Sequence, residues 1–268
     1  MTTLLTTIII IILTLSSLAI SSLICILYKP PKWLIRWLQA RHPNVLFHVP
    51  TGDKTVALTI DDGPSRHTAE IRRLLRAHGV TATFFVIGSH IPGHEQTLRE
   101  LVLDGHELAN HAMYDEPALR IPPEELARQI QTVERQIRDI YDSVDPRPSA
   151  VKKRQPRYFR PGSGFFTASM LALLAQPRLN YRLVLGSIYP WDAQISWPRL
   201  NAWHILSSVT PGATIVIHDR PWTAPMLRIV LPALRRHGWR VGTVTDLLSH
   251  SVQARVREDG EGRSQWEE

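Results

Sequence analysis

Residues 55–64 read TVALTIDDGP and decide the fold. The first six form an apolar run that is typical of a buried strand. This strand delivers two adjacent carboxylates, Asp61 and Asp62, to a Gly-Pro turn, and α/β folds place their active sites at the carboxyl ends of such strands. Because neighbouring strand side chains point apart, we expect one aspartate to bind a metal ion and the other to act as a base. The alternative is a loop Asp pair that caps a helix.

Strand-like and helix-like segments alternate over residues 44–250. Further strand-like runs lie at residues 81–87, 181–185, 213–217 and 239–244, and helix-like segments lie at residues 68–78, 94–104, 122–141 and 225–237. Gly79 follows the first of these helices as a C-terminal cap, and Pro122 begins the longest. This alternation with short loops predicts a parallel sheet or barrel.

Composition sets limits on the class of protein. The chain has 268 residues, 44% hydrophobic and 21% charged, which excludes a wholly disordered chain. Cys25 is the single cysteine, so neither an internal disulfide nor a cysteine-rich zinc site is expected. The net charge of +7 raises the question of nucleic acid. Residues 1–43 contain four basic side chains and no acidic one. The rest of the chain has no regular alternation of aromatic and basic residues, so we expect no nucleic-acid partner.

The amino terminus resembles a membrane segment. Residues 4–28 contain no charged side chain, and these 25 residues exceed the roughly 20 that a helix needs to cross a bilayer. A cleaved secretion signal is the alternative, but its apolar core is usually about 7–15 residues long and follows a basic region. We therefore expect residues 1–28 to be an uncleaved single-pass anchor that contacts the lipid bilayer through residues 4–28.

Residues 29–45 form a basic segment after this anchor. Trp33 and Trp37 lie one helical turn apart, beside Lys32 and Arg36, which is typical of a helix at the membrane interface. The alternative is an amphipathic helix docked on the following domain. At the other end of the chain, residues 251–268 are polar and are expected to be a disordered tail.

Four further clusters contain candidate chemical groups. In residues 105–117, His111 and Asp115 are four positions apart, so a helical turn would place both on one face as ligands of one metal ion; a surface histidine is the alternative. Arg160 follows a short strand and can orient a carboxylate. Asp192 follows Trp191, and the apolar run at residues 215–217 leads into His218.

These five clusters, in this order, resemble the polysaccharide deacetylase (NodB-like) family, carbohydrate esterase family 4, over most of residues 50–250. The resemblance implies a distorted (β/α) barrel over residues 46–250, preceded by the N-terminal transmembrane helix, with a metal site at the carboxyl ends of the strands. It also implies roles for individual residues. The implied catalytic residues are the base Asp61, the general acid His218, Arg160 that holds Asp61, and Asp192 that tunes His218.

The implied metal ligands are Asp62, His111 and Asp115, of which Asp115 stands where the family has a histidine. An Asp–His–Asp set carries more negative charge and favours harder cations than zinc. Pro161, Ser163 and Trp191 are expected to border the substrate, and the Ser163 N–H to face the oxyanion. Ser163 stands in place of the family's aromatic residue, and Ala193 stands in place of its tryptophan.

The resemblance therefore predicts a metal-dependent hydrolase that removes N-acetyl groups from a chitin-like amino-sugar polymer or oligomer and releases acetate. The expected cofactor is a divalent metal ion, zinc first and cobalt or manganese as alternatives, and the expected partner is an N-acetylglucosamine-containing glycan. Two other functions stay open. One is a catalytically weakened, membrane-tethered carbohydrate-binding protein, and the other is an amidohydrolase of a small non-sugar amide.

Polysaccharide chemistry predicts a catalytic domain on the lumenal or extracellular side of the membrane. The cations of residues 29–41 argue for the opposite orientation, since positive flanks favour the cytoplasm.

Overall fold

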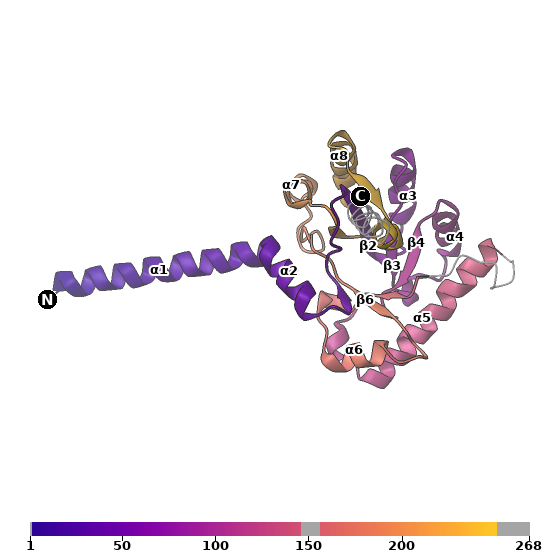
Figure 1. Cartoon of the computed structure of the whole chain (residues 1–268), viewed down its shortest axis with the longest axis horizontal. Helices are drawn as coiled ribbons and strands as arrows, with labels where there is room; N and C mark the ends of the chain where they lie inside the picture. The colour runs from indigo at the N-terminus through magenta and orange to yellow at the C-terminus, as the bar shows by residue number, and fades with distance from the viewer. Residues whose placement is uncertain (1, 146–155, 251–268) are drawn as a thin grey trace, which may run out of the picture.

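The computed structural model describes residues 2–145 and 156–250 (Figure 1). The polar tail predicted at residues 251–268 lies outside them. The described residues form an α/β domain around one parallel sheet, as the alternation of strand-like and helix-like segments predicts.

The sheet is open and curled, a half-barrel. Its strands run in the order β1 (Val45–Leu46), β6 (Arg182–Val184), β5 (Tyr158–Phe159), β4 (Glu107–Asn110), β3 (Thr83–Val86), β2 (Thr55–Gly63) and β7 (Thr214–His218), and β8 (Arg240–Gly242) pairs with the first residues of β2. All of these pairings are parallel. Among the described strands β1 and β7 do not pair, and isolated bridges span the opening, an antiparallel one between His48 and Ala213 and a parallel one between Ile188 and Ile215. The predicted barrel is therefore only partly closed.

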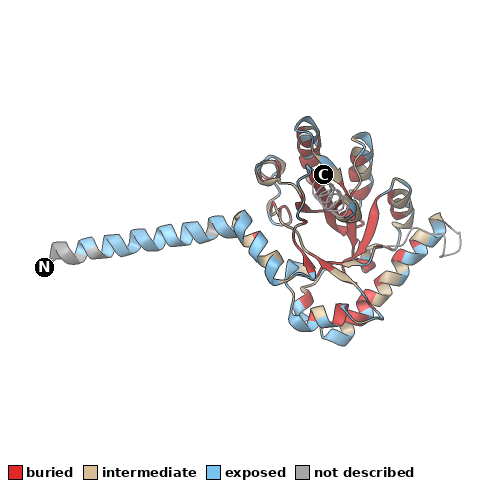
Figure 2. Cartoon of the chain, viewed as in Figure 1, coloured by how far each residue is buried: buried red, intermediate tan, exposed pale blue. Residues whose placement is uncertain are grey.

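Strand β2 lies at the centre of the domain. All nine of its residues are buried, because it has neighbours on both edges and helices outside the sheet. Six helices cover the sheet: α3 (Thr68–Ala77), α4 (Glu95–Leu103), α5 (Pro123–Val144), α6 (Ala168–Leu174), α7 (Pro198–Ser208) and α8 (Thr223–Arg236). Figure 2 shows that their buried residues face the sheet and their exposed residues face outward. The apolar core thus holds the strand ends in fixed positions.

The predicted elements are largely present. The four predicted helices correspond to α3, α4, α5 and α8, and Gly79 has the positive φ of a helix C-terminal cap. The helices α6 and α7 and the short strands β1 and β4 were not predicted from the sequence. Short 3₁₀ turns, η1 (Gly88–His90), η2 (Ala118–Arg120) and η3 (Gly162–Gly164), complete the loops.

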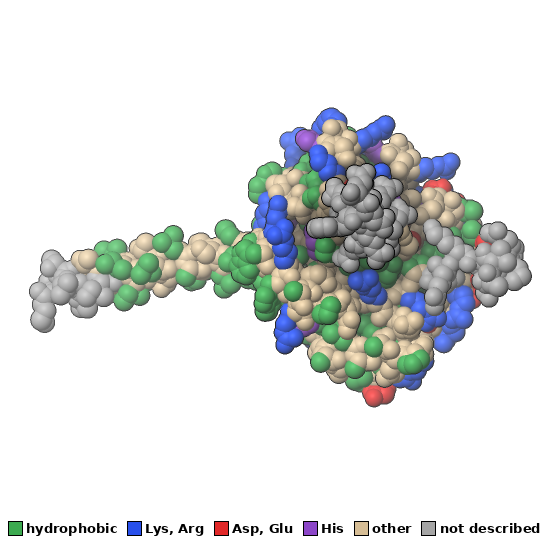
Figure 3. Space-filling view, viewed as in Figure 1, with side chains coloured by type: hydrophobic (Ala, Val, Ile, Leu, Met, Phe, Trp, Pro, Cys, Tyr) green, Lys and Arg blue, Asp and Glu red, His purple; other side chains and the backbone are tan. Residues whose placement is uncertain are grey.

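Helix α1 (Thr2–Tyr28) projects from the domain (Figure 1). By length and composition it is the one helix in the described part of the chain that could cross a membrane, and a signal sequence near the N-terminus would meet the same criteria. Figure 3 shows hydrophobic side chains along α1 and basic side chains where it meets the domain.

Helix α2 (Lys32–Arg41) is docked on the domain. Ile35 is buried, and the Gln39 amide donates to the carbonyl of Val45 and accepts from the amide of Phe47, both at 2.9 Å. Trp33 and Trp37 point outward, 66% and 57% exposed. The helix therefore combines the two arrangements expected for it: one face is packed on the domain, and the tryptophans are free to contact a membrane surface.

Candidate active site

Strand register brings the predicted catalytic residues to one edge of the sheet. Asp61 of β2 lies directly across from His218 of β7. On the other side, Asn110 of β4 pairs with Phe159 of β5, so the next residues, His111 and Arg160, leave the sheet at the same edge. Because all the strands are parallel, these side chains gather at their carboxyl ends.

Arg160 holds Asp61 in a buried ion pair. The Arg160 guanidinium donates to Asp61 Oδ1, to the Thr59 hydroxyl at 2.9 Å and to the carbonyls of Val184 and Leu185 at 3.0 and 2.6 Å. Both charged side chains are almost fully buried. Four acceptors fix the guanidinium, so Asp61 is oriented by a group that cannot rotate away, and its charge is compensated.

Asp62 contacts different partners from Asp61. Its backbone has φ +65°, in the left-handed region, and its carboxylate lies 3.3 Å from His111 Nε2 and 2.6 Å from Arg220 Nη2. Burial raises the pKa of Asp62, but the His111 hydrogen bond and the charges of His111, His218 and Arg220 outweigh it and lower the pKa well below its ordinary value. Asp62 is therefore ionised at any ordinary pH.

His111 is oriented as a metal-binding histidine is. Its Nδ1 lies 2.7 Å from the carbonyl of Arg160, which accepts the Nδ1 proton, and its Nε2 lies 3.3 Å from Asp62 Oδ1 and hydrogen-bonds to it. A backbone carbonyl on Nδ1 is the usual outer-shell arrangement of a histidine ligand, and a metal ion would replace the proton on Nε2. Asp62 and His111 therefore fit a divalent cation as two of its ligands.

Asp115 does not join this pair, and the predicted helical turn from His111 to Asp115 is wrong. Ala112 has φ +65°, which a right-handed helix does not contain, and the Asn110 side chain accepts the Ala112 N–H at 2.9 Å. The segment after β4 is therefore a loop, and Asp115 is exposed on it. Within residues 2–145 and 156–250, no three His, Cys, Asp or Glu side chains lie close enough to hold a metal ion.

His218 and Asp192 form the second charged pair of the edge. Asp192 is fully buried and accepts two hydrogen bonds from His218, one from Nδ1 at 2.9 Å and one from the backbone N–H at 2.7 Å. Burial lowers the pKa of His218, but the hydrogen bond and charge of Asp192, with the charges of Asp61 and Asp62, outweigh it and raise the pKa above its ordinary value. His218 therefore keeps its proton to higher pH than an ordinary histidine does.

The residues expected to border the substrate have different environments. Ser163 is exposed, with φ +64°, at the tip of η3, and Pro161 is buried beneath it. The Trp191 indole N–H donates to the carbonyl of Tyr28 at 3.2 Å, so that edge of the ring faces the end of α1. Tyr189, which the sequence analysis did not single out, lies edge-on to both His218 and Trp191, at 5.6 and 5.3 Å between ring centres.

Two further polar residues of the site, Asp219 and Arg220, directly follow His218 in the chain and were assigned no role from the sequence. Asp219 is buried and accepts hydrogen bonds from the hydroxyls of Ser65 and Thr68, which fixes the turn after β2. Arg220 is the cation on Asp62 Oδ2. The sequence IVIHDR contained both residues, but only the fold shows which groups they contact.

The chain is similar to known polysaccharide deacetylases. Residues 48–183 match the family model described as polysaccharide deacetylase. A chitooligosaccharide deacetylase from a Bradyrhizobium species is 32% identical, over 74% of this chain and 92% of that protein. A peptidoglycan-N-acetylglucosamine deacetylase from Bacillus cereus is 28% identical, over 77% of this chain and 93% of that protein.

Solved structures show the same fold. The peptidoglycan deacetylase PdaC from Bacillus subtilis superposes with a TM-score of 0.67 at 26% identity, over 81% of this chain and the whole of that chain. A pseudoenzyme of carbohydrate esterase family 4 from Bacillus anthracis superposes with a TM-score of 0.65 at 21% identity, over 76% of this chain and 68% of that one.

Proposed function

The chain belongs to the polysaccharide deacetylase family of hydrolases acting on carbon–nitrogen bonds, and on that premise we propose that it removes N-acetyl groups from N-acetylglucosamine-containing glycans and releases acetate. The observation that carries the proposal is the pairing of Asp61 with His218 across β2 and β7. One carboxylate is held by Arg160, and one histidine is held by Asp192. A base and an acid therefore lie on adjacent strands.

Asp61 is the proposed general base. A base must keep its lone pairs directed at the attacking water, and Arg160 fixes the Asp61 carboxylate from one side and leaves the other oxygen free of that contact. Asp61 takes a proton from water as the water attacks the amide carbon. The Ser163 N–H, at the tip of η3, is the proposed donor to the developing oxyanion.

His218 is the proposed general acid. Expelling an unprotonated amide nitrogen is prohibitive, so the departing sugar amine must receive a proton as the C–N bond breaks. The raised pKa of His218, caused mainly by Asp192 against the effect of burial, keeps that proton on the ring to higher pH than in an ordinary histidine. A divalent cation bound by Asp62 and His111 would supply Lewis acidity at this edge. Zinc is the first candidate, with cobalt and manganese as alternatives, and Asp115 would have to move to contribute a third ligand.

Acetate release tests this proposal directly. Full-length protein in detergent, loaded in turn with zinc, cobalt or manganese, is incubated with chitooligosaccharides and with peptidoglycan, and metal content is measured on the same preparation. We expect metal-dependent release that Asp61→Asn reduces at least a hundredfold, in line with loss of a general base. Wild-type activity in Asp61→Asn, or no acetate release from either glycan with any of the three metals, would contradict the mechanism.

A carbohydrate-binding protein without activity is the second candidate. It is favoured by the exposed position of Asp115 and by Arg220, which occupies one oxygen of Asp62. Against it, binding alone needs neither a held base nor a held acid. Tight glycan binding by a protein that takes up none of the three metals would select this candidate, and release from small non-sugar amides alone would select an amidohydrolase.

We further propose that residues 1–28 are an uncleaved anchor, residues 29–45 a juxtamembrane segment and residues 46–250 the catalytic domain, on the lumenal or extracellular side. The support is the projecting, exposed helix α1 and the glycan substrates of the relatives. Protease treatment of intact and opened vesicles decides the orientation. Digestion of the domain in intact right-side-out vesicles fits the proposal, and protection of the domain in them contradicts it.

A further inference from the structure

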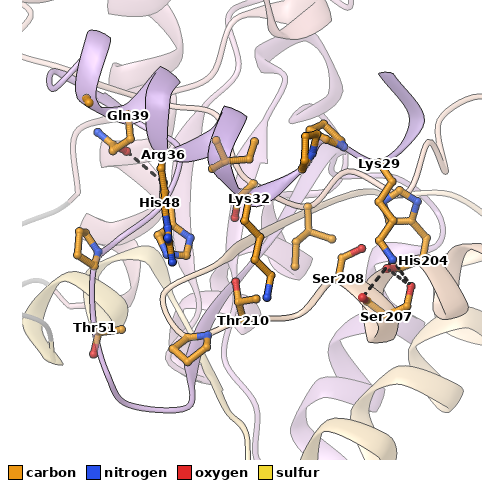
Figure 4. Close-up of a pocket in the computed structure, with 18 residues that line it drawn as sticks. Lys29, Lys32, Arg36, Gln39, His48, Thr51, His204, Ser207, Ser208 and Thr210 are labelled. Atoms are coloured by element: carbon orange, nitrogen blue, oxygen red, sulfur yellow. Dashed lines mark hydrogen bonds between the residues drawn. The ribbon is translucent and has the colours of Figure 1, made fainter. Parts of the chain in front are cut away.

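A cavity of about 900 Å³ lies where the N-terminal helices meet the domain. One wall is formed by α2 and the residues just before it, and the opposite wall by the last turn of α7 and the loop that follows (Figure 4). It is separate from the candidate active site: none of Asp61, Asp62, His111, Arg160 or His218 lines it.

The charge of this cavity has one sign. Lys29, Lys32 and Arg36 line it, and among the described residues no aspartate or glutamate does. Burial lowers the pKa of His204, to about 4, and that of His48, with the charges of Lys29 and Arg36 as second causes. The two imidazoles are thus neutral near pH 7, and the three long cations give the cavity its charge. In Figure 4 the Lys32 side chain lies between those of Lys29 and Arg36.

Two polar atoms in the wall lack partners in the part of the chain that the structure describes. His204 is 1% exposed, and neither its Nδ1 nor the Ser208 hydroxyl has a hydrogen-bond partner among the described residues, although both residues line the cavity. Leaving buried polar groups unsatisfied costs about 1–3 kcal/mol each. Lys29, by contrast, is fixed: its ammonium donates to the Ser207 hydroxyl at 2.8 Å and lies over the Trp203 ring. Cations and open hydrogen-bonding positions together form a site for an anion with several oxygens.

The surroundings favour an amphipathic anion over a free one. Pro30, Ile35 and Ile188 give the cavity apolar wall area beside its cations. Its rim begins at Lys29, one residue after the apolar helix α1 ends, and Trp33 and Trp203, at that end of the domain, are more than half exposed. If α1 lies in a bilayer, as proposed above, the cavity lies at the depth of the lipid headgroups.

We propose that this cavity binds the phosphate group of an anionic membrane lipid. Lys32 and Arg36 contact the phosphate oxygens, Ser208 donates to one of them, and the apolar wall receives the glycerol end of the acyl chains. The proposal rests on the membrane attachment of α1 and is independent of deacetylation. Bound lipid would hold the domain in one orientation against the membrane.

The test measures binding to full-length protein in neutral detergent micelles by calorimetry. The ligands are short-chain phosphatidic acid, short-chain phosphatidylcholine and inorganic phosphate. We expect saturable binding of phosphatidic acid, at least tenfold tighter than that of either other ligand. The double variant Lys32→Gln/Arg36→Gln should weaken it at least tenfold. Arg235→Gln/Arg236→Gln, which removes the same charge from the exposed end of α8, should leave it unchanged.

Each other outcome overturns the proposal. Equal affinity for inorganic phosphate would make the cavity a free-phosphate site, and equal affinity for phosphatidylcholine would mean micelle partitioning. Equal losses in both double variants would mean that binding follows net charge alone. Ser208→Ala, which removes one hydroxyl, provides a milder variant should the double variant unfold, and it should weaken phosphatidic acid severalfold. Resistance of α1 to alkaline extraction from membranes is measured separately, so failure of the anchor and failure of the site are distinguishable.

Discussion

At the scale of single residues, the Asp192–His218 pair sets the pH range of the proposed reaction. The pKa of His218 is raised mainly by Asp192, against the effect of burial. The acid form therefore persists above the ordinary histidine pKa of about 6.5 and is lost as the pH rises through the raised value. Removing the Asp192 charge must lower that pKa, and the loss of activity then begins at lower pH.

We expect Asp192→Asn to shift the alkaline limb of kcat/KM for acetate release to lower pH by at least one unit, and to reduce activity at pH 8 at least tenfold. The amide oxygen introduced by this substitution can still accept one of the two hydrogen bonds that Asp192 accepts from His218. Asp53→Asn, at an exposed carboxylate, is the matched control and should keep the wild-type profile. An unchanged alkaline limb in Asp192→Asn would remove His218 from the role of acid.

Arg220 competes with a metal ion for Asp62. Its guanidinium lies 2.6 Å from the second carboxylate oxygen, so a cation that uses both oxygens must displace it against like-charge repulsion. We expect Arg220→Gln to bind zinc about tenfold more tightly than wild type, measured by competition with a chromogenic chelator.

Arg228→Gln is the control for this measurement. It breaks an exposed pair with Glu70, which is 2.7 Å long and remote from Asp62. Zinc affinity should be unchanged in it. Weaker zinc binding in Arg220→Gln would show instead that Arg220 keeps Asp62 in its ligating position.

At the scale of elements, the sequence predicted a strand and its functional residues correctly where those residues directly follow an apolar run. The run at residues 55–60 identified β2, and the residues that follow identified Asp61 and Asp62, because burial of a whole strand and a turn after it are local properties. Strand β4 was missed because its four residues, ELAN, begin and end with polar side chains and so contain no apolar run, although all four are buried, and the spacing of His111 and Asp115 fits a helix equally well. The positive φ of Ala112, which decides the matter, is accompanied by a local hydrogen bond from its N–H to Asn110 and by a long-range one from the Gly88 N–H in η1 to its carbonyl, and no local pattern contains the second.

Contacts between elements were likewise beyond local patterns. The pairing of Arg160 with Asp61 was inferred from family resemblance, and it joins residues 99 positions apart. Arg220 and Tyr189 have ordinary sequence surroundings, and their places beside Asp62 and His218 arise only once β2 and β7 pair.

The loops after β4 and β5 touch at Gly162. A Cβ on Gly162 would lie 2.1 Å from the carbonyl oxygen of Glu116, whereas one on Gly164 would meet nothing within 4 Å. Gly162→Ala must therefore separate the two loops, which moves the Ser163 N–H. We expect it to reduce kcat for acetate release at least tenfold.

Gly164→Ala is the control, because it adds the same methyl group where φ is +72° without a clash. It should lower the free energy of unfolding by about 1 kcal/mol through backbone strain and leave kcat within about twofold of wild type. Equal loss of kcat in both variants would mean that loop strain, and not the contact with Glu116, controls the reaction.

At the scale of the whole molecule, buried histidines make stability depend on pH in two opposite ways. Burial lowers the pKa of His106 and of His204 to about 4, so the unfolded chain binds more protons than the folded one between about pH 6.5 and 4. The part of the free energy of unfolding that depends on these two histidines being neutral is therefore fully present above about pH 6.5 and is lost on acidification. The pKa values of His111 and His218 are raised, so their contribution is complete below 6.5 and is lost as the pH rises through the raised values. Stability should therefore be greatest near neutral pH.

His106 offers the sharpest test of the acid side. It is 3% exposed between β3 and β4, its Nδ1 accepts the Ala82 N–H at 3.1 Å, and its Nε2 has no partner among the described residues. Between pH 7 and pH 5 this histidine is protonated in the unfolded chain but stays neutral in the folded one, which lowers the free energy of unfolding by roughly 2 kcal/mol. His106→Asn keeps an acceptor for Ala82 but cannot titrate. In urea unfolding followed by tryptophan fluorescence, the loss of unfolding free energy between these pH values should be about 2 kcal/mol smaller in His106→Asn than in wild type. His237→Asn, at an exposed histidine, should lose as much as wild type, and an equal loss in all three proteins would show that acid destabilisation arises elsewhere.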